Sequence, residues 1–262
     1  EEQSIQEEFS PAYEVREPTG VLTPFVFSSP HSGSIYSNYF LKKSRLNVRT
    51  LRKSEDIYVD KLFVRAAAHG APFISAFFPR AYVDVNREPY ELDPELFSEC
   101  LPDWVNARSI RVAGGLGTIP RLVGDGDKIY NEPLFLKDAL IRIEKLYKPF
   151  HSSLQTLLER AHNLFGYAIL VDCHSMPSGQ SEGSINGKPD FVIGDRFGTS
   201  CDKRLTRYVQ TMLTDLGYLV QINRPYAGGY ITEHYGRPRF GFHSIQIEVN
   251  RALYVDENSL EQ

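Results

Sequence analysis

The run YAILVDCHS, residues 167–175, constrains the fold of this chain more than any other stretch. Its side chains are apolar almost without interruption, and the run becomes polar only at its end. A strand buried on both faces of a sheet has this pattern, and the carboxyl ends of such strands are where α/β sheets bind ligands. The run therefore predicts a central strand of an α/β fold, with His174 at the end that opens onto a site.

Short β-rich runs alternate with longer helical patterns along the rest of the chain, as a sheet covered by helices requires. Helical spacing predicts a helix over about residues 47–68, and two helices or one kinked helix over residues 134–165, where Lys148-Pro149 interrupts the pattern. We expect a single domain over residues 1–262, with a mixed, largely parallel sheet flanked by helices. Further strands are predicted in FVFSSPH, PFISAFF, AYVDVN, DFVIGD, YLVQIN and HSIQIEVN.

Charge and cysteine content exclude several classes of function. The formal net charge is −4, and Lys and Arg form no cluster that would concentrate nucleic acid or anionic lipid. No apolar run approaches the ~20 residues that span a bilayer, and the acidic start lacks the features of a signal peptide. Three cysteines without CxxC spacing indicate neither a disulfide framework nor a thiolate zinc site. We therefore expect a cytoplasmic protein with a small-molecule substrate.

Two histidines occupy matching positions in the predicted sheet. His31 ends FVFSSPH and His174 ends YAILVDCHS, and small polar residues follow each of them. Neutral imidazole is the commonest protein ligand of catalytic zinc, so both side chains are candidate ligands in one crevice. The alternative is that each is a hydrogen-bonded core residue or a surface residue.

A catalytic zinc site usually has three protein ligands and an open position for water, so a third ligand is needed. The segment LRKSEDIYVDKLF offers Glu55, Asp56 and Asp60 near a helix start. We prefer Asp56, with Glu55 second. The alternative is that Glu55 and Asp56 stabilise the first helical turn through the positive end of its dipole.

Three further segments carry polar groups that are suited to a binding or catalytic site. In YVDVNR, Arg87 suits a bidentate pair with a carboxylate and Asn86 adds a donor, although a salt-bridged strand end would have the same residues. Glu248 alternates with apolar neighbours in HSIQIEVN and shares a face with Gln246. The Gly-rich and Tyr-rich segment RPYAGGYITEHYGRPRFGF is predicted to be a binding loop.

Several stretches of the chain also form an ordered set of motifs. They are PHSG at residues 30–33, the Asp56 region, SAFFPRAYVDVNR, GGLGTIP with Tyr130 following, YKPFH, ILVDCHSMPS, NRPYAGGYIT and QIEVNRALY. In this order they resemble the N-formylglutamate amidohydrolase family, over about residues 26–254. Any single motif would be weak, whereas DCHSMPS together with NRPYAGG is specific.

The resemblance implies zinc-dependent hydrolysis of N-formyl-L-glutamate to formate and L-glutamate, the last step of one route of histidine degradation. It also implies a zinc-carboxypeptidase-like (phosphorylase/hydrolase-like) fold, since the family is distantly similar to the zinc carboxypeptidases and aspartoacylases. The HxxE ligand pair of the carboxypeptidases is missing here, because Ser34 stands three residues after His31. The carboxylate ligand must therefore come from elsewhere in the chain, and the resemblance to the carboxypeptidases does not itself identify it as Asp56.

On this resemblance the site residues have separate expected roles. Glu248 would be the general base and Arg80 would polarise the scissile carbonyl. The substrate's α-carboxylate would be held by Asn86 and Arg87, and its side-chain carboxylate by backbone N–H groups of the loop that contains Tyr226, Gly228 and Gly229. The expected ligands of Zn2+ are His31, Asp56 and His174.

Three other functions remain open at this point. The same zinc chemistry would serve another N-acyl amino acid or a small peptide, because the pocket and not the metal selects the acyl group. A metal-free binding protein could retain the fold. A cysteine hydrolase would use Cys173, although a cysteine inside VDCHS is more often packed beside its strand than exposed as a nucleophile.

Overall fold

The computed structural model describes residues 2–124, 126–180 and 188–261, and its chain folds into two compact units. The first unit comprises Glu1–Glu14, Pro30–Glu55 and Ile74–Gln155. The second comprises Val15–Ser29, Asp56–Phe73 and Thr156–Gln262. The main sheet has seven strands in the order β1-β3-β2-β6-β9-β7-β8.

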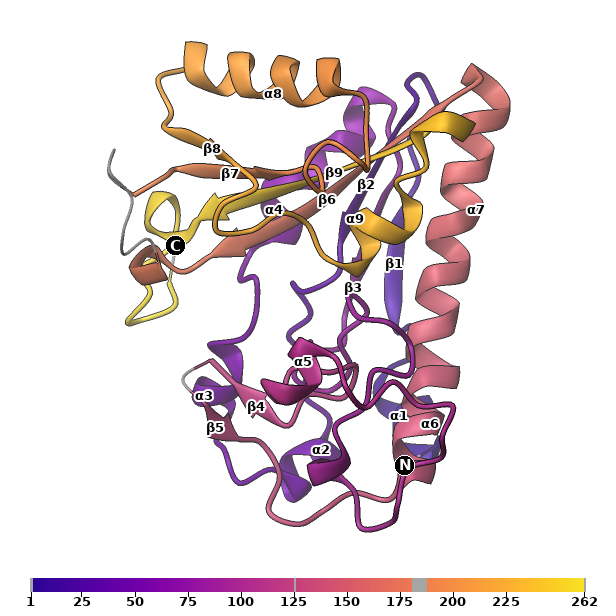
Figure 1. Ribbon diagram of the computed structural model, residues 1–262, viewed down its shortest axis with the longest axis vertical. Helices are drawn as coiled ribbons and strands as arrows, with labels where there is room; N and C mark the ends of the chain where they lie inside the picture. Colours follow the sequence, from indigo (N-terminus) through magenta and orange to yellow (C-terminus); the bar gives the residue numbers. More distant parts are fainter. Residues whose placement is uncertain (1, 125, 181–187, 262) are drawn as a thin grey trace. The chain divides into compact units, whose positions relative to one another are not determined.

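The second unit contains the central strands of the sheet (Figure 1). Strands β2, β6 and β9 run parallel, β7 pairs antiparallel with β9, and β8 runs parallel to β7. The predicted mixed, largely parallel sheet is therefore confirmed, and so are the strands predicted in this unit. Their bounds are β2 Phe25–Ser29, β6 Ala168–Met176, β7 Phe191–Gly194, β8 Val220–Ile222 and β9 Phe242–Asn250.

The two faces of this sheet differ in chemistry because successive side chains of a strand point in opposite directions. One face carries an apolar cluster that includes Val171, Cys173 and Ile247, and helices α4 (Val59–Phe63) and α8 (Lys203–Asp215) pack against it. On the other face, polar residues of β6 and β9 lie side by side, with Asp172 opposite Gln246 and His174 opposite Glu248. Helix α9 (Tyr230–Tyr235) contacts both strands, and Figure 1 shows it on the side of the sheet opposite α8.

The first unit has an aromatic core that surrounds a buried arginine. Phe40 and Tyr82 pack ring to ring, and the Arg142 guanidinium lies 4.0 Å from the centre of the Tyr82 ring. The helices and strands of this first unit are α1 Glu2–Glu8, α2 Asn38–Lys43, α3 Val48–Arg52, η2 Pro94–Leu96, α5 Ile110–Ala113, the antiparallel pair of β4 Leu122–Val123 and β5 Asp127–Lys128, and α6 Leu136–Arg142.

A few elements remain. Strands β1 Tyr13–Arg16 and β3 Phe73–Ala76 complete the main sheet, so the strand predicted in PFISAFF is confirmed. Residues 136–165 are helical throughout, with a π-helical turn η3 (Ile143–Tyr147) between α6 and α7 (Lys148–Phe165). That turn ends two residues before Pro149, whose missing N–H breaks the regular α-helical hydrogen bonding. The short helices are η1 Val64–His69, η4 Ser178–Gln180, η5 Pro238–Phe240 and η6 Arg251–Leu253.

Three predictions of secondary structure are wrong. Residues 47–68 do not form one helix. Helix α3 ends at Arg52, residues 53–58 form a turn, and the chain becomes helical again at α4 after Tyr58, whose φ is 61°. This turn buries the carboxylates of Glu55 and Asp56, which need polar partners that a surface helix would not offer. The loop predicted over 224–242 also contains α9.

The segment AYVDVN is not a strand, although all six of its residues are buried. It forms consecutive turns, in which the Asp84 side chain accepts a hydrogen bond from the backbone N–H of Asn86. Such local side-chain bonds to the backbone compete with strand pairing. Among the described residues, no helix has the length and apolarity to cross a bilayer.

Candidate metal centre

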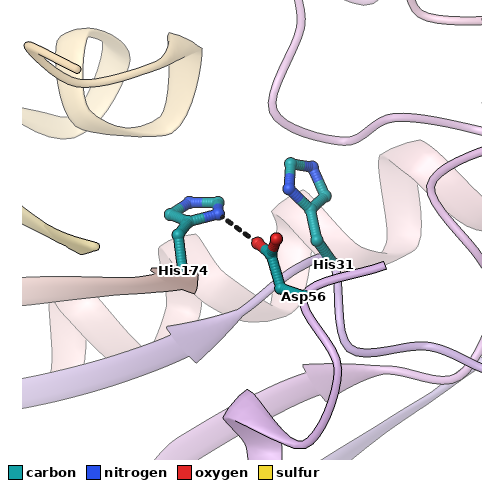
Figure 2. Close-up of side chains that lie close together, drawn as sticks. All are labelled: His31, Asp56 and His174. Atoms are coloured by element: carbon teal, nitrogen blue, oxygen red, sulfur yellow. Dashed lines mark hydrogen bonds and ion pairs between the residues drawn. The ribbon is translucent and has the colours of Figure 1, made fainter. Parts of the chain in front are cut away.

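Three buried side chains from distant parts of the sequence lie close together (Figure 2). His31 follows β2 by two residues, Asp56 lies in the turn before α4, and His174 lies near the carboxyl end of β6. One ligand atom from each of the three lies within 4.8 Å of the others. The structure therefore brings together the three residues that the sequence nominated as metal ligands, here called the His–Asp–His group.

The imidazole of His174 has a carboxylate at each nitrogen. Its Nδ1 lies 2.8 Å from Oδ2 of Asp56 and its Nε2 lies 2.9 Å from Oδ2 of Asp172. Burial disfavours a charge on this ring, but Asp172 and Asp56 outweigh it and raise the pKa of His174 well above its usual value. The same negative field that stabilises a protonated ring also stabilises a metal cation beside it.

His31 is held from the other side by Asp84. Its Nε2 lies 2.7 Å from Oδ1 of Asp84, whose Oδ2 accepts a hydrogen bond from Arg80 at 2.9 Å. Burial raises the pKa of the Asp84 carboxyl, but Arg87, His31 and Arg80 outweigh it and hold that pKa well below its usual range. Asp84 is therefore an ionised acceptor that engages Nε2, so we assign Nδ1 of His31 as the nitrogen on the ligand side.

This donor set fits zinc. Two imidazoles and one carboxylate are the ligand types found at catalytic zinc centres, which keep one further position for water. Histidine ligands commonly bond through their second nitrogen to a carboxylate that orients the ring, and Asp84 and Asp172 occupy those positions here. The His–Asp–His group contains no thiolate ligand.

Glu55, the second choice for the carboxylate ligand, has other partners. Its Oε1 accepts a hydrogen bond from the Tyr36 hydroxyl at 2.6 Å, and its Oε2 accepts one from Nε of Arg52 at 3.2 Å. Both contacts hold Glu55 in the turn that carries Asp56. These contacts favour Asp56 as the third ligand.

Glu248 lies directly across from His174 in the register of β9 and β6, and it is buried. Its Oε1 accepts a hydrogen bond of 2.8 Å from Nε2 of Gln246. The alternation predicted for this strand is confirmed, since Ile245, Ile247 and Val249 belong to the apolar cluster on the opposite face. Glu248 is therefore a buried carboxylate on the same sheet face as His174.

The residues proposed to bind substrate carboxylates make several contacts within the protein. Arg87 donates from Nε to the Leu116 carbonyl and from Nη1 to the Asn86 carbonyl, each at 2.8 Å. Burial lowers the pKa of Arg87 to about 10, although Asp84 opposes this shift. The Arg80 side chain is 25% exposed and is the more accessible of the two guanidinium groups, since that of Arg87 is 11% exposed.

The loop with Tyr226, Gly228 and Gly229 leads into α9. Gly228 has a φ of 111°, a conformation that favours glycine, and its carbonyl accepts a hydrogen bond from Nη1 of Arg196. The N–H of Gly229 donates to Oε1 of Gln246 at 2.9 Å. One N–H of this loop is therefore already bonded to the sheet.

Sequence reasoning did not select three residues that lie around the site. Asp172 stands two residues before His174, so the period of a strand places it on the same face, and this signal was present in the sequence. Arg251 lies 3.5 Å from Oδ1 of Asp56 and donates from Nε to the Ser175 hydroxyl. Gln246 was recognised only as sharing a face with Glu248.

Cys173 belongs to the apolar face, away from His174. Its side chain is buried in the cluster with Val171 and Ile247, and burial raises the pKa of its thiol well above the usual value. A nucleophilic cysteine needs a lowered pKa and access to the substrate. This placement disfavours the cysteine-hydrolase alternative.

Comparison with known proteins gives three further findings. The family model described as N-formylglutamate amidohydrolase matches residues 23–255. Two proteins named N-formylglutamate deformylase are similar along most of their length: that of Pseudomonas putida is 29% identical over 89% of this chain and 82% of its own, and that of Pseudomonas aeruginosa is 28% identical over 90% and 84%.

Among solved structures, an N-formylglutamate amidohydrolase from Ralstonia eutropha JMP134 superposes with a TM-score of 0.90 at 33% identity. The match covers 96% of this chain and 90% of that one. A gene product of Agrobacterium tumefaciens shares the fold, with a TM-score of 0.67 at 17% identity over 98% and 91% of the two chains.

Proposed function

Because this chain belongs to the N-formylglutamate amidohydrolase family, we propose that it hydrolyses N-formyl-L-glutamate to formate and L-glutamate with the help of a zinc ion. Two relatives named N-formylglutamate deformylase support the substrate. The buried His–Asp–His group is the observation that supports a metal-dependent reaction. A carboxypeptidase-like fold, a single catalytic domain over residues 1–262, a cytoplasmic location and a role in histidine degradation are further parts of the proposal.

His31, Asp56 and His174 would hold the zinc ion, each through one donor atom. When bound, zinc supplies Lewis acidity, which lowers the pKa of water and polarises a carbonyl oxygen. Asp84 is hydrogen-bonded to Nε2 of His31, and Asp172 lies 2.9 Å from Nε2 of His174 as a charged neighbour. These contacts set the ring orientation before any ligand arrives.

Glu248 is the proposed general base. Amide hydrolysis requires a proton to leave the attacking water and a proton to reach the departing amine, and one positioned carboxylate can do both in turn. Glu248 lies across from His174, and Gln246 holds one of its oxygens. Its burial excludes bulk water that would compete for the proton.

Arg80 is the proposed donor to the scissile carbonyl, where negative charge develops. Arg80 donates to Asp84, which in turn is hydrogen-bonded to His31, so two contacts connect the Arg80 guanidinium to the proposed metal ligand. Asn86 and Arg87 are proposed to bind the α-carboxylate of the substrate. Tyr226, Gly228 and Gly229 are proposed to bind its side-chain carboxylate.

Release of the free amino acid from a panel of N-acyl amino acids, measured together with the carboxylic acid that leaves, tests this function. We expect the fastest release from N-formyl-L-glutamate, loss of activity after chelation and recovery after zinc is restored. The panel includes N-acetylglutamate and a formyl dipeptide, because a pocket distinguishes acyl groups only by its shape and polar contacts. Unchanged activity in metal-free protein would refute the role of zinc, and preference for another compound would reassign the substrate.

A further inference from the structure

The side-chain amide of Gln246 links two parts of the second unit. Its Oε1 accepts the N–H of Gly229 at 2.9 Å, and its Nε2 donates to Oε1 of Glu248 at 2.8 Å. A backbone N–H can only donate, and an ionised carboxylate can only accept, so both contacts are satisfied by one orientation of the amide. Gln246 is buried, which makes both bonds costly to break.

The loop that Gln246 holds is pressed directly against the sheet. Gly194 of β7 lies opposite Gln246 of β9, and a Cβ at Gly194 would stand 2.6 Å from the Gly228 nitrogen and 2.7 Å from the Ala227 carbonyl carbon. Only a glycine leaves room for that approach. The Ala227 carbonyl also accepts the backbone N–H of Arg196 at 2.8 Å.

A carboxylate that moves a proton needs a fixed direction, because the accepting oxygen must point at the proton. The last torsion of a glutamate side chain is soft, so burial alone does not set the plane of the carboxylate. The hydrogen bond from Gln246 does set it, since it fixes one of the two oxygens. The second bond of Gln246, from the Gly229 N–H to its Oε1, holds the loop of Tyr226, Gly228 and Gly229 at a fixed position relative to the carboxylate plane.

We propose that Gln246 is a positioning residue that orients the Glu248 carboxylate and couples it to the loop of Tyr226, Gly228 and Gly229. This inference rests on the proposed function, in which Glu248 moves the proton and the loop binds the side-chain carboxylate of the substrate. Gln246 then bonds to both the loop and the base, so the position of the bound substrate and the direction of the proton acceptor are coupled.

The variant Gln246→Met tests this role, because methionine has nearly the same length but neither donates nor accepts these bonds. We expect kcat to fall about 10- to 100-fold and KM for N-formylglutamate to rise, with zinc content unchanged. The matched control is Gln210→Met on α8, where a half-buried glutamine undergoes the same substitution away from the site. That control should keep the kinetics of the parent enzyme.

A double-mutant cycle with Glu248→Gln separates positioning from packing. If Gln246 acts through Glu248, Gln246→Met should lower kcat in the parent and have little further effect in the Glu248→Gln background, because coupled residues are not additive. Equal losses in both backgrounds would show a packing role and overturn the inference. Parent kinetics in Gln246→Met, while Glu248→Gln is inactive, would overturn it as well.

A second measurement does not depend on activity. In protein labelled with ¹⁵N-glycine, the Gly229 amide resonance should shift in Gln246→Met and stay in place in Gln210→Met, since Gly229 donates to Gln246. An unmoved resonance would contradict the link to the loop. Failure of the proposed function has a different signature, namely no formate release by the parent or a Glu248→Gln variant within tenfold of it.

Discussion

Asp172 places a carboxylate oxygen 2.9 Å from Nε2 of His174, while Asp56 meets the other nitrogen of the same ring at 2.8 Å. Asp84 bears the same relation to Nε2 of His31. Each histidine of the His–Asp–His group thus has its own orienting carboxylate, from the same strand in one case and from a buried turn in the other. We therefore expect the orienting carboxylates to contribute to metal affinity.

Asp172→Asn should weaken zinc binding about 10- to 100-fold, because the amide keeps the shape of the side chain but loses the charge that orients His174. Competition with a chromophoric chelator measures that affinity directly. Asp190→Asn is the matched control, since Asp190 directly precedes β7 and its side chain accepts the backbone N–H of Leu219, with no bond to a histidine of the group. Equal zinc affinities for Asp172→Asn and the parent protein would remove Asp172 from the metal centre.

His31→Ala and His174→Ala should each lose zinc and activity, with about one zinc per chain in the parent. Metal analysis of the purified proteins gives the occupancy. Asp56→Ala should lose zinc and Glu55→Ala should retain it, since Glu55 is bonded to Tyr36 and Arg52. The reverse result for that pair would move the third ligand to Glu55, and full occupancy in a histidine variant would remove that histidine.

Glu248→Gln should separate chemistry from binding. The amide has nearly the same shape but is no base, so zinc should stay bound while kcat falls by about two to four orders of magnitude. Steady-state kinetics and zinc content measured on the same preparation check both parts. A kcat within tenfold of the parent would show that another group accepts the proton.

Arg87→Lys should raise KM for N-formylglutamate far more than it changes zinc content, because lysine cannot make two parallel hydrogen bonds to a carboxylate. N-formylglutamine should show a similar rise, whereas an analogue with its α-carboxylate amidated should already be poor and change little. Because Arg87 also bonds the Leu116 and Asn86 carbonyls, a thermal melt must accompany the kinetics. A lower Tm with unchanged KM would leave Arg87 with a structural role.

Six of the seven strands of the main sheet were predictable because burial leaves a local pattern in the sequence, whereas the partly buried β1 was not predicted. β6 is apolar on both faces up to its polar end, and β9 alternates, so each run shows its own environment. The turns around Asp84 were not predictable in this way. Their residues are as buried and as β-prone as those of a strand, and local hydrogen bonds distinguish them, such as the one from the Asn86 N–H to Asp84.

For the site, the sequence allowed single candidate residues to be predicted, but not the contacts between them. His31 and His174 could be nominated together because the carboxyl ends of parallel strands meet at one edge of a sheet. The partners of those rings depend on side-chain contacts across 53 and 118 residues of sequence, as for His31 with Asp84 and His174 with Asp56. The bond between Gln246 and Gly229 likewise needs the loop to be folded back onto β9.

The burial of two of the three cysteines gives this protein a single site for thiol chemistry. Cys173 and Cys201 are buried, and burial raises the pKa of both thiols, that of Cys201 to about 11. Cys100 is exposed. Because alkylating and dye-coupling reagents react with accessible thiolates, they should modify Cys100 alone in the folded protein. One fluorophore or surface tether can therefore be attached per chain with the native sequence, and the β6 strand that carries His174 stays untouched.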